Sequence, residues 1–296
     1  MFNFRLQVFH SAATNLSFTR AAKELYITQP AVTGNIKELE NILGINLFDR
    51  GKNGISLTEA GEVLLRYTKQ AMEDYKKMEY EIGQLKNSFS GKLKVGASTT
   101  IEQYVLPPIL VRFNRKYPDI EILLYNNNTM HVEKDVRQHE VDLGIVEGNT
   151  GNKEFRYTPF MKDEIVAVAH TSQSVSKKTE ITLEEFKRLP LIVRETGSGS
   201  LDVIISALQK HQIRQKDLNI KMYLGSTESI KTYLANANCI SLISIQAVQK
   251  EIANGEFQII DIEGLEIIRM FNFIYPQGQQ NGLVDKFIEF CLKNKL

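Results

Sequence analysis

Two apolar-periodic segments separated by only three residues constrain the N-terminal fold most strongly. Apolar residues recur at helical spacing over residues 18–25, and a second periodic run begins after the connector 26–28. Thr28 is a favourable N-cap, Pro30 falls in the first turn where its missing N–H costs nothing, and Gly44 can end the helix. A preceding helix, which ends before Ser17 caps the next one, is predicted by Phe4, Val8, Phe9 and Ala12. The pattern therefore predicts three helices, the last two joined by a tight turn.

The third predicted helix has a small, polar face opposite its apolar stripe. The stripe consists of Val32, Ile36, Leu39 and Leu43. At 100° per residue the opposite face carries Pro30, Thr33, Gly34, Lys37 and Asn41, with Gln29 exposed at the tip. The major groove of DNA, about 12 Å wide, admits such a helix, so that Gln or Thr can contact base edges and Lys37 a phosphate. The pattern fits a helix-turn-helix, with an ordinary helical hairpin as the alternative.

A short hairpin is predicted directly after these helices. Strand-like segments at 47–48 and 55–57 flank the turn 51–54, and Arg50 and Lys52 would lie where a wing reaches the phosphates of a neighbouring minor groove. Residues 1–57 hold six basic and four acidic side chains, whereas the whole chain has a formal charge of only +1. Any binding to DNA must therefore depend on the local arrangement of side chains rather than on the net charge of the chain.

The residues of this region match a known pattern over some forty positions. They are Ala21, Ala22, Gln29, Pro30, Ala31, Val32, Leu39, Glu40, Leu47, Phe48, Arg50 and the run from Leu57 to Gly61. With them the segment resembles the winged helix-turn-helix of LysR-type transcriptional regulators. The sequence departs from that family at Thr33-Gly34-Asn35, where many members carry Ser and then a basic or polar residue. Gly34 either permits close approach of the backbone to DNA or is merely tolerated.

The predicted contacts to double-stranded promoter DNA follow from the helix face and from this resemblance. We expect them from Thr19, Arg20, Thr28, Gln29, Pro30, Thr33, Asn35, Lys37 and Arg50.

A long helix is predicted next, because no proline occurs over residues 58–88. A seam with one stutter consists of Ala60, Leu64, Tyr67, Ala71, Tyr75, Met78, Ile82, Leu85 and Phe89. This seam predicts pairing with a second copy of the chain, and packing within one chain is the alternative. The resemblance implies dimers through this linker helix, and often tetramers.

The remainder of the chain predicts an α/β domain of two similar halves. Strands are expected at 92–97, 120–125, 143–146, 165–169, 191–194, 220–224, 240–243 and 257–260, with long strands near 158–163 and 267–275. Helices are expected near 102–117, 132–138, 201–211, 229–237, 245–254 and 283–292. The resemblance implies a two-lobed effector domain like that of periplasmic solute-binding proteins. The expected boundaries are 1–58 for the winged domain, 59–90 for the linker and 91–296 for the effector domain, with lobe I at 91–161 and 266–296 and lobe II at 162–265.

Hydroxyl-rich segments are predicted at three points where a strand leads into a helix: residues 97–104, 194–200 and 225–229. Ligands of such sheets bind at the carboxyl ends of strands, and helix N-termini with hydroxyls favour an anion or a carboxylate. Each segment taken alone could simply cap a helix, and Arg194 could add a positive charge. The predicted ligand contacts are Ser98, Thr99, Thr100, Gln103, Thr196, Ser198, Ser200 and Thr227.

Several other classes of protein find little support. The five histidines lack metal-ligand spacing, and no nucleophile elbow or phosphate-binding loop occurs, so we expect no catalytic residue, no metal and no cofactor. The start of the chain does not resemble a signal peptide and no apolar run suits a membrane helix, which argues against a transport protein and for the cytoplasm. Cys239 and Cys291 leave a redox-responsive regulator of the same fold as the alternative function.

These observations predict a DNA-binding regulator that responds to a small effector. The effector is expected to be an anionic or carboxylate metabolite bound between the two lobes, and the resemblance admits RNA polymerase as a further partner.

Overall fold

The computed structural model describes residues 3–51, 54–85, 89–148, 152–277 and 282–295. The chain divides into two compact units, Met1–Ser88 and Phe89–Leu296, which are considered separately. Among the described residues, no helix is both long and apolar enough to cross a membrane. The boundaries expected for the winged domain, the linker and the two lobes remain predictions.

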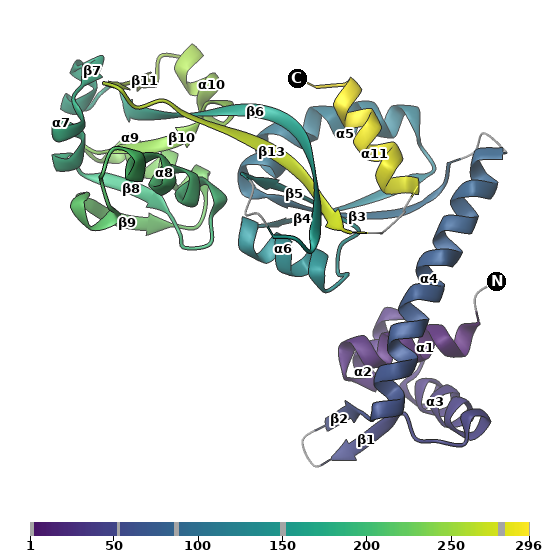
Figure 1. The fold of residues 1–296 in the computed structure, drawn as a ribbon. Helices are drawn as coiled ribbons and strands as arrows, with labels where there is room; N and C mark the ends of the chain where they lie inside the picture. Colours follow the sequence, from purple (N-terminus) through teal and green to yellow (C-terminus); the bar gives the residue numbers. More distant parts are fainter. Residues whose placement is uncertain (1–2, 52–53, 86–88, 149–151, 278–281, 296) are drawn as a thin grey trace. The chain divides into compact units, whose positions relative to one another are not determined.

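The N-terminal unit begins with three helices and a hairpin (Figure 1). They are α1 (Phe4–Asn15), α2 (Phe18–Glu24) and α3 (Gln29–Leu43), followed by the antiparallel strands β1 (Phe48–Gly51) and β2 (Gly54–Leu57). The predicted caps are confirmed, because Ser17 accepts a hydrogen bond from the Arg20 N–H and Thr28 accepts one from the Ala31 N–H. Gly44 ends α3 in the left-handed conformation. The helix-turn-helix and its wing are therefore present.

Three members of the predicted apolar stripe of α3 lie in the core of this unit. Val32, Ile36 and Leu39 are buried against α1 and α2, whereas Leu43 is 47% exposed. The last turn of α3 extends past the packed helices, so burial of Leu43 was predicted wrongly.

The long helix α4 (Glu59–Leu85) spans about 40 Å at 1.5 Å per residue. Its first turns pack on the winged domain through Ala60 and Leu64, and Tyr67, Met78 and Ile82 are exposed further along. Phe89 packs in the core of the second unit. The predicted seam is therefore shorter than expected, because its first members and its last one pack within the chain.

Gly61 marks the closest approach between α4 and the wing. A Cβ atom at this position would lie 2.2 Å from the Leu47 carbonyl oxygen and 2.9 Å from the Leu57 side chain. The Leu47 oxygen also accepts a hydrogen bond from the Thr58 N–H at 3.1 Å, which holds the start of α4 against the wing. A larger residue would have to separate these elements.

The second unit is built on a mixed sheet of nine strands (Figure 1). The strand order is β4-β3-β5-β13-β6-β10-β8-β9, and β11 also pairs with β6. The strands of the first lobe are β3 (Gly91–Ser98), β4 (Ile120–Asn127) and β5 (Leu143–Glu147), and those of the second are β8 (Leu191–Arg194), β9 (Ile220–Leu224) and β10 (Ile240–Ser244). The crossing strands β6 (Phe155–His170) and β13 (Ile267–Pro276) run between these lobes.

Two expectations about the sheet need correction. The strands predicted at 158–163 and 165–169 are one continuous strand, β6. Pairing is parallel among β3, β4 and β5 and among β8, β9 and β10, as an α/β domain predicts, but antiparallel where β13 meets β5 and β6 and where β6 meets β10 and β11. The crossing strands enter each lobe from the opposite direction, so the middle of the sheet cannot be parallel.

Helices cover both lobes, and all of them except α7 lie close to predicted positions. They are α5 (Leu106–Lys116), α6 (Thr129–Arg137) and α11 (Gly282–Lys293) in the first lobe, and α7 (Leu183–Arg188), α8 (Gly199–Lys210), α9 (Thr227–Asn236) and α10 (Ile245–Ala253) in the second. The π-helix η1 (Ile101–Val105) precedes α5. Several short elements were not predicted from the sequence: α7, the 3-10 helices η2 (Ser174–Lys177) and η3 (Gln215–Asp217), and the strands β7 (Glu180–Ile181) and β12 (Asp261–Ile262), while β11 covers Phe257–Ile259.

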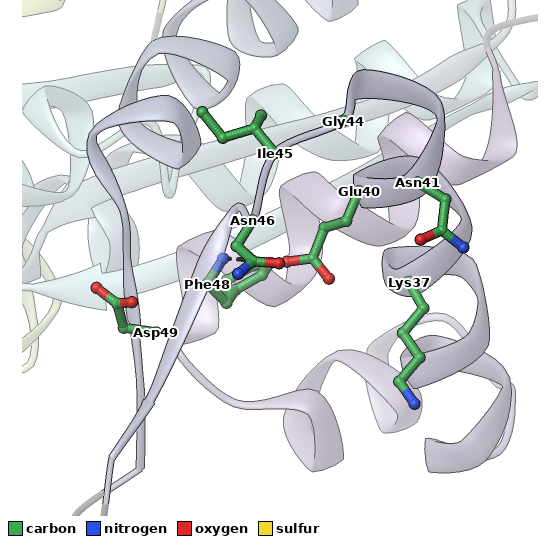
Figure 2. A pocket seen from close by; sticks show the side chains of 8 residues that line it. All are labelled: Lys37, Glu40, Asn41, Gly44, Ile45, Asn46, Phe48 and Asp49. Carbon is green, nitrogen blue, oxygen red and sulfur yellow. Dashed lines mark hydrogen bonds between the residues drawn. The ribbon is translucent and has the colours of Figure 1, made fainter.

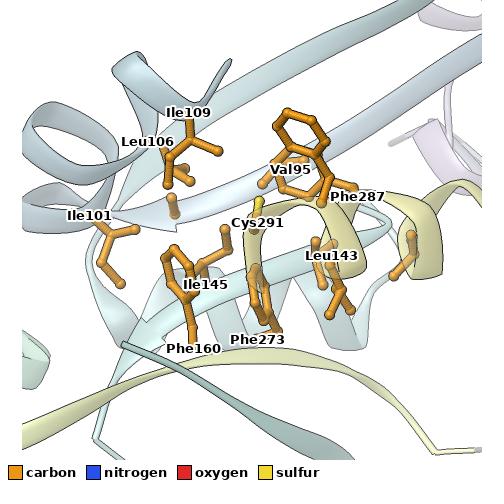
Figure 3. Close-up of a cluster of buried hydrophobic side chains, with 14 of the residues drawn as sticks. Val95, Ile101, Leu106, Ile109, Leu143, Ile145, Phe160, Phe273, Phe287 and Cys291 are labelled. Carbon is orange, nitrogen blue, oxygen red and sulfur yellow. The ribbon is translucent and has the colours of Figure 1, made fainter. Parts of the chain in front are cut away.

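Each lobe has its own apolar core. In the first, Phe287 and Cys291 of α11 belong to one cluster with the sheet residues Leu143 and Ile145 (Figure 3). In the second, one cluster lies around Phe186 and Leu191, and another contains Cys239. The lobes can therefore pack separately, and the crossing strands and the contacts between the lobes determine how they are joined.

We predict that Gly61→Ala destabilises the N-terminal unit by about 1–3 kcal/mol, because overpacking of this size has that cost. Gly34→Ala is the matched control, since no atom lies within 4 Å of its added Cβ and alanine favours a helix by about 1 kcal/mol. Urea unfolding of the full-length protein, followed by circular dichroism, measures both changes. A Gly61→Ala protein as stable as the wild type would contradict the close packing.

Candidate functional site

The outer face of α3 is accessible in the N-terminal unit. Gln29, Pro30 and Lys37 are exposed. Thr33 is half-buried, its hydroxyl donating to the Gln29 carbonyl oxygen at 3.2 Å and accepting from the Gln29 side-chain amide at 3.2 Å. These side chains therefore form one polar surface, with Gln29 already held by its neighbour.

The remaining predicted DNA contacts lie at the N-cap of α3, elsewhere on α3, on α2 and in β1. Thr28 is exposed but its hydroxyl caps α3, and the Asn35 side-chain amide donates to the Ala31 carbonyl oxygen at 2.9 Å. Thr19 and Arg20 are exposed on α2. Arg50 lies in β1, where only the backbone is described, and Lys52 lies outside the described residues. All of these contacts remain predictions.

A groove separates the C-terminal half of α3 from the first strand of the wing (Figure 2). Lys37, Asn41 and Asp49 are among the residues that line it. The Glu40 carboxylate fixes the geometry of this groove, because it accepts hydrogen bonds from the Leu47 N–H at 2.8 Å and the Phe48 N–H at 3.3 Å. Glu40 thus positions the wing beside α3, a role that its place in the sequence did not reveal.

The three hydroxyl-rich segments of the second unit follow the carboxyl ends of β3, β8 and β9, as predicted. Ser98 and Ser198 are 1% exposed, and their hydroxyl oxygens have no hydrogen-bond partner among the described residues. The Gln103 side-chain oxygen is likewise buried and unpartnered there. Buried polar groups are rarely left unpaired, which makes these three atoms candidates for contact with a ligand or water.

Helix capping accounts for only one of these segments. Thr100 and Ser198 occupy N-cap positions without making the side-chain capping bond, whereas Ser226 caps α9 by accepting from the Ser229 N–H. Thr227 is buried in the first turn of α9 and Thr196 is exposed. Capping therefore leaves the Ser98–Thr100 and Ser198 hydroxyls unexplained.

A buried arginine joins the first two segments. The Arg194 guanidinium, 5% exposed, donates from Nη2 to the Thr99 hydroxyl at 3.3 Å, so it reaches from the second lobe to the first. Thr99 is also 3.2 Å from the Asn126 side-chain oxygen. The site thus has a cation and several neutral hydrogen-bonding groups. The sequence indicated Arg194, whereas Asn126, near the end of β4, was not singled out.

A second polar cluster also bridges the lobes. The Tyr104 hydroxyl donates to Glu228, and Lys231 forms ion pairs with Glu228 at 2.7 Å and Glu251 at 2.6 Å. Burial, reinforced by Glu228, raises the pKa of Tyr104 well above its usual range. Burial lowers the pKa of Lys231, but its two carboxylate partners outweigh that effect and the net shift is upward. Both groups therefore keep their protons at neutral pH.

Buried charges also hold the two crossing strands together. The Arg269 guanidinium contacts Asp163 at 2.7 Å, Glu147 at 3.5 Å and the Ser200 hydroxyl at 2.7 Å, and all three ionic side chains are at most 2% exposed. Asp163 also accepts from the Ser244 hydroxyl at 2.7 Å. Burial raises the pKa of Asp163, which Arg269 opposes. Ser200 accepts a hydrogen bond within this cluster, and its contact with ligand remains a prediction.

The two cysteines lie in different apolar cores. Burial raises the pKa of the Cys239 thiol to about 11 and that of the Cys291 thiol to about 12. Both are thus protonated thiols at neutral pH, whereas the thiolate is the reactive form. Among the described residues, no group of His, Cys, Asp and Glu is arranged to hold a metal ion.

We predict that Asp163→Asn destabilises the second unit by about 3–5 kcal/mol, because it leaves the buried Arg269 charge without its nearest partner. Differential scanning calorimetry of the full-length protein measures the change. Glu154→Gln is the control, since it removes an exposed ion pair with Arg137 and should leave the melting temperature unchanged. Equal behaviour of the two variants would contradict a structural role for the buried pair.

Comparison with known proteins adds family information to this geometry. Residues 4–62 match the model "Bacterial regulatory helix-turn-helix protein, lysR family", and residues 86–295 match "LysR substrate binding domain". A probable RuBisCO transcriptional regulator of Phaeodactylum tricornutum is 33% identical over 292 residues, which cover 98% of this chain and 95% of that protein.

Two solved structures share the fold. The CcmR regulatory domain of Synechocystis PCC6803, in complex with 2-PG, is 26% identical with a TM-score of 0.62, and the match covers 69% of this chain and 97% of that one. Full-length CbnR complexed with its target DNA is 18% identical with a TM-score of 0.61, and 99% of each chain is covered.

Proposed function

The chain belongs to the LysR family of bacterial transcriptional regulators, and from this premise we propose that it binds promoter DNA as a dimer or tetramer and responds to a small anionic metabolite. The metabolite would bind between the lobes of the effector domain and shift the population of conformations that bind DNA. Such a regulator acts on DNA in the cytoplasm, and RNA polymerase is a further partner of the proposed complex.

The observation that carries the ligand proposal is that the buried hydroxyls of Ser98 and Ser198 lack partners among the described residues, in the two segments that the Arg194–Thr99 hydrogen bond joins. The hydroxyls of Ser98 and Ser198 can donate to an oxyanion, and Arg194 supplies the positive charge. The related CcmR regulatory domain was solved in complex with 2-PG. A small oxyanion therefore suits the donors in this chain.

The DNA-binding part of the proposal rests on α3 and the wing. Gln29 and Thr33 can hydrogen-bond to base edges, and the exposed Lys37 can neutralise a phosphate. Gly34 has open space around it, which allows close approach of the DNA backbone. The structural relative CbnR was solved in complex with its target DNA.

Apolar side chains of α4 that are exposed in the single chain support self-association through this helix. Tyr67, Met78 and Ile82 are 69%, 44% and 45% exposed, at positions of the predicted seam. Pairing of these side chains with those of a second copy of the chain would remove this apolar surface from water.

The alternatives are less well supported. A redox-responsive regulator would need a reactive thiolate, and burial disfavours that form for both Cys239 and Cys291. The family consists of regulators rather than enzymes, which supports the expectation that this protein has no enzymatic activity.

We predict that Lys37→Ala weakens binding to every DNA sequence and lowers the salt dependence of binding by about one counterion, because a single phosphate contact is lost. Gln29→Ala should instead relax base preference, at a cost of about 1–3 kcal/mol on the preferred sequence only. Fluorescence anisotropy with promoter and random duplexes at several salt concentrations separates these effects. The same uniform loss for both variants would refute the assigned roles.

We also predict that Ser98→Ala and Ser198→Ala each weaken anion binding about tenfold or more, because each removes a hydrogen bond to a charged ligand. A thermal-shift titration of the full-length protein with phosphate, sulfate and small carboxylates provides the measurement. Ser206→Ala, at an exposed position of α8, is the matched control and should bind like the wild type. Unchanged binding in both site variants would place the ligand elsewhere.

A further inference from the structure

The Arg194 guanidinium is already occupied by a carboxylate of the same chain. Its Nε donates to Glu195 Oε2 at 2.8 Å, and its Nη2 donates to Glu195 Oε1 at 3.1 Å. This bidentate arrangement is the one by which arginine binds the carboxylate or phosphate of a ligand. The adjacent glutamate therefore fills the place that a bound oxyanion would take.

The two partners differ in their access to solvent. The Arg194 side chain is 5% exposed and the Glu195 side chain 29% exposed. A buried guanidinium without a counter-charge is unstable, so an anion has to accompany Arg194 whether or not ligand is present. Glu195, the more accessible partner, can rotate toward solvent while Arg194 stays in place. An exchange of Glu195 for a ligand anion would keep the buried charge neutralised.

Glu195 also connects the two lobes. Its Oε1 accepts a hydrogen bond from the Asn128 side-chain amide of the first lobe at 3.3 Å. Close by, the Met130 N–H of the first lobe donates to the Gly197 carbonyl oxygen of the second at 3.2 Å. Removal of the Glu195 carboxylate from Arg194 would therefore also break a contact between the lobes.

We propose that Glu195 is an internal counter-anion that competes with the ligand, and that the ligand's oxyanion displaces it from Arg194. This inference rests on the proposed function and specifies its ligand. The ligand must present two oxygens to the guanidinium fork, as a carboxylate, phosphate or sulfate does, because a neutral group would leave Arg194 unpaired. Binding then releases Asn128 from Glu195, which links occupation of the site to the contact between the lobes.

The test compares Glu195→Gln with the wild type in the full-length protein. Isothermal titration calorimetry with inorganic phosphate, and separately with sulfate, is performed at constant ionic strength. Glutamine keeps the size of the side chain and one acceptor oxygen but removes the competing charge and the bidentate pairing with Arg194, so the variant should bind the anion about tenfold more tightly or better. Glu184→Gln, which removes an exposed carboxylate paired with Lys187, should bind like the wild type.

The other outcomes are equally informative. Equal affinity in Glu195→Gln and wild type would overturn the competition while leaving the anion site intact. Weaker binding in the variant would show that Glu195 holds Arg194 in position for the ligand, which also overturns the proposal. If neither protein binds either anion, the anionic ligand of the proposed function fails as well. Glu195→Ala, which lacks the same carboxylate, replaces Glu195→Gln if that variant does not fold.

Discussion

The ladder between β6 and β13 is the constraint on which the second unit depends, since these strands carry the chain from one lobe to the other (Figure 1). Arg269 and Asp163 are direct partners in this ladder, and their side chains form an ion pair of 2.7 Å. Ser200 of α8 and Ser244 at the end of β10 bond to the same pair. Backbone pairing and a buried charge cluster therefore fix the strands at the point where the lobes meet.

The contacts that surround this point are of two kinds. The Arg269 cluster is deeply buried and bonded to groups from both crossing strands, which suits a permanent connection. The contacts that Arg194 makes with Thr99 and Glu195 makes with Asn128 across the lobes are both 3.3 Å long, the Glu195 side chain is partly accessible, and the hydroxyls of Ser98 and Ser198 lack partners among the described residues. A ligand can change contacts of the second kind without disturbing the first. This division allows the lobes to respond to an effector while the domain stays folded.

Local features could be predicted from the sequence, and features that depend on distant partners could not. Ser17, Thr28 and Gly44 mark helix ends because capping involves only a few neighbouring residues. The sequence predicted two strands, 158–163 and 165–169, where β6 is continuous, because the partner that allows Asp163 to be buried, Arg269, lies more than a hundred residues away. Glu195 appeared unremarkable for the same reason, since its contact with Asn128 exists only after both lobes have formed.

The central claim is that a bound oxyanion and bound DNA influence one another. Fluorescence anisotropy of a labelled promoter duplex, titrated with the full-length protein with and without saturating phosphate, sulfate or 2-PG at constant ionic strength, tests it directly. The account predicts that an anion which raises the melting temperature also changes the affinity for this duplex by about 5- to 150-fold, a typical range for coupled sites. An anion that binds and raises the melting temperature but leaves DNA affinity unchanged would contradict it.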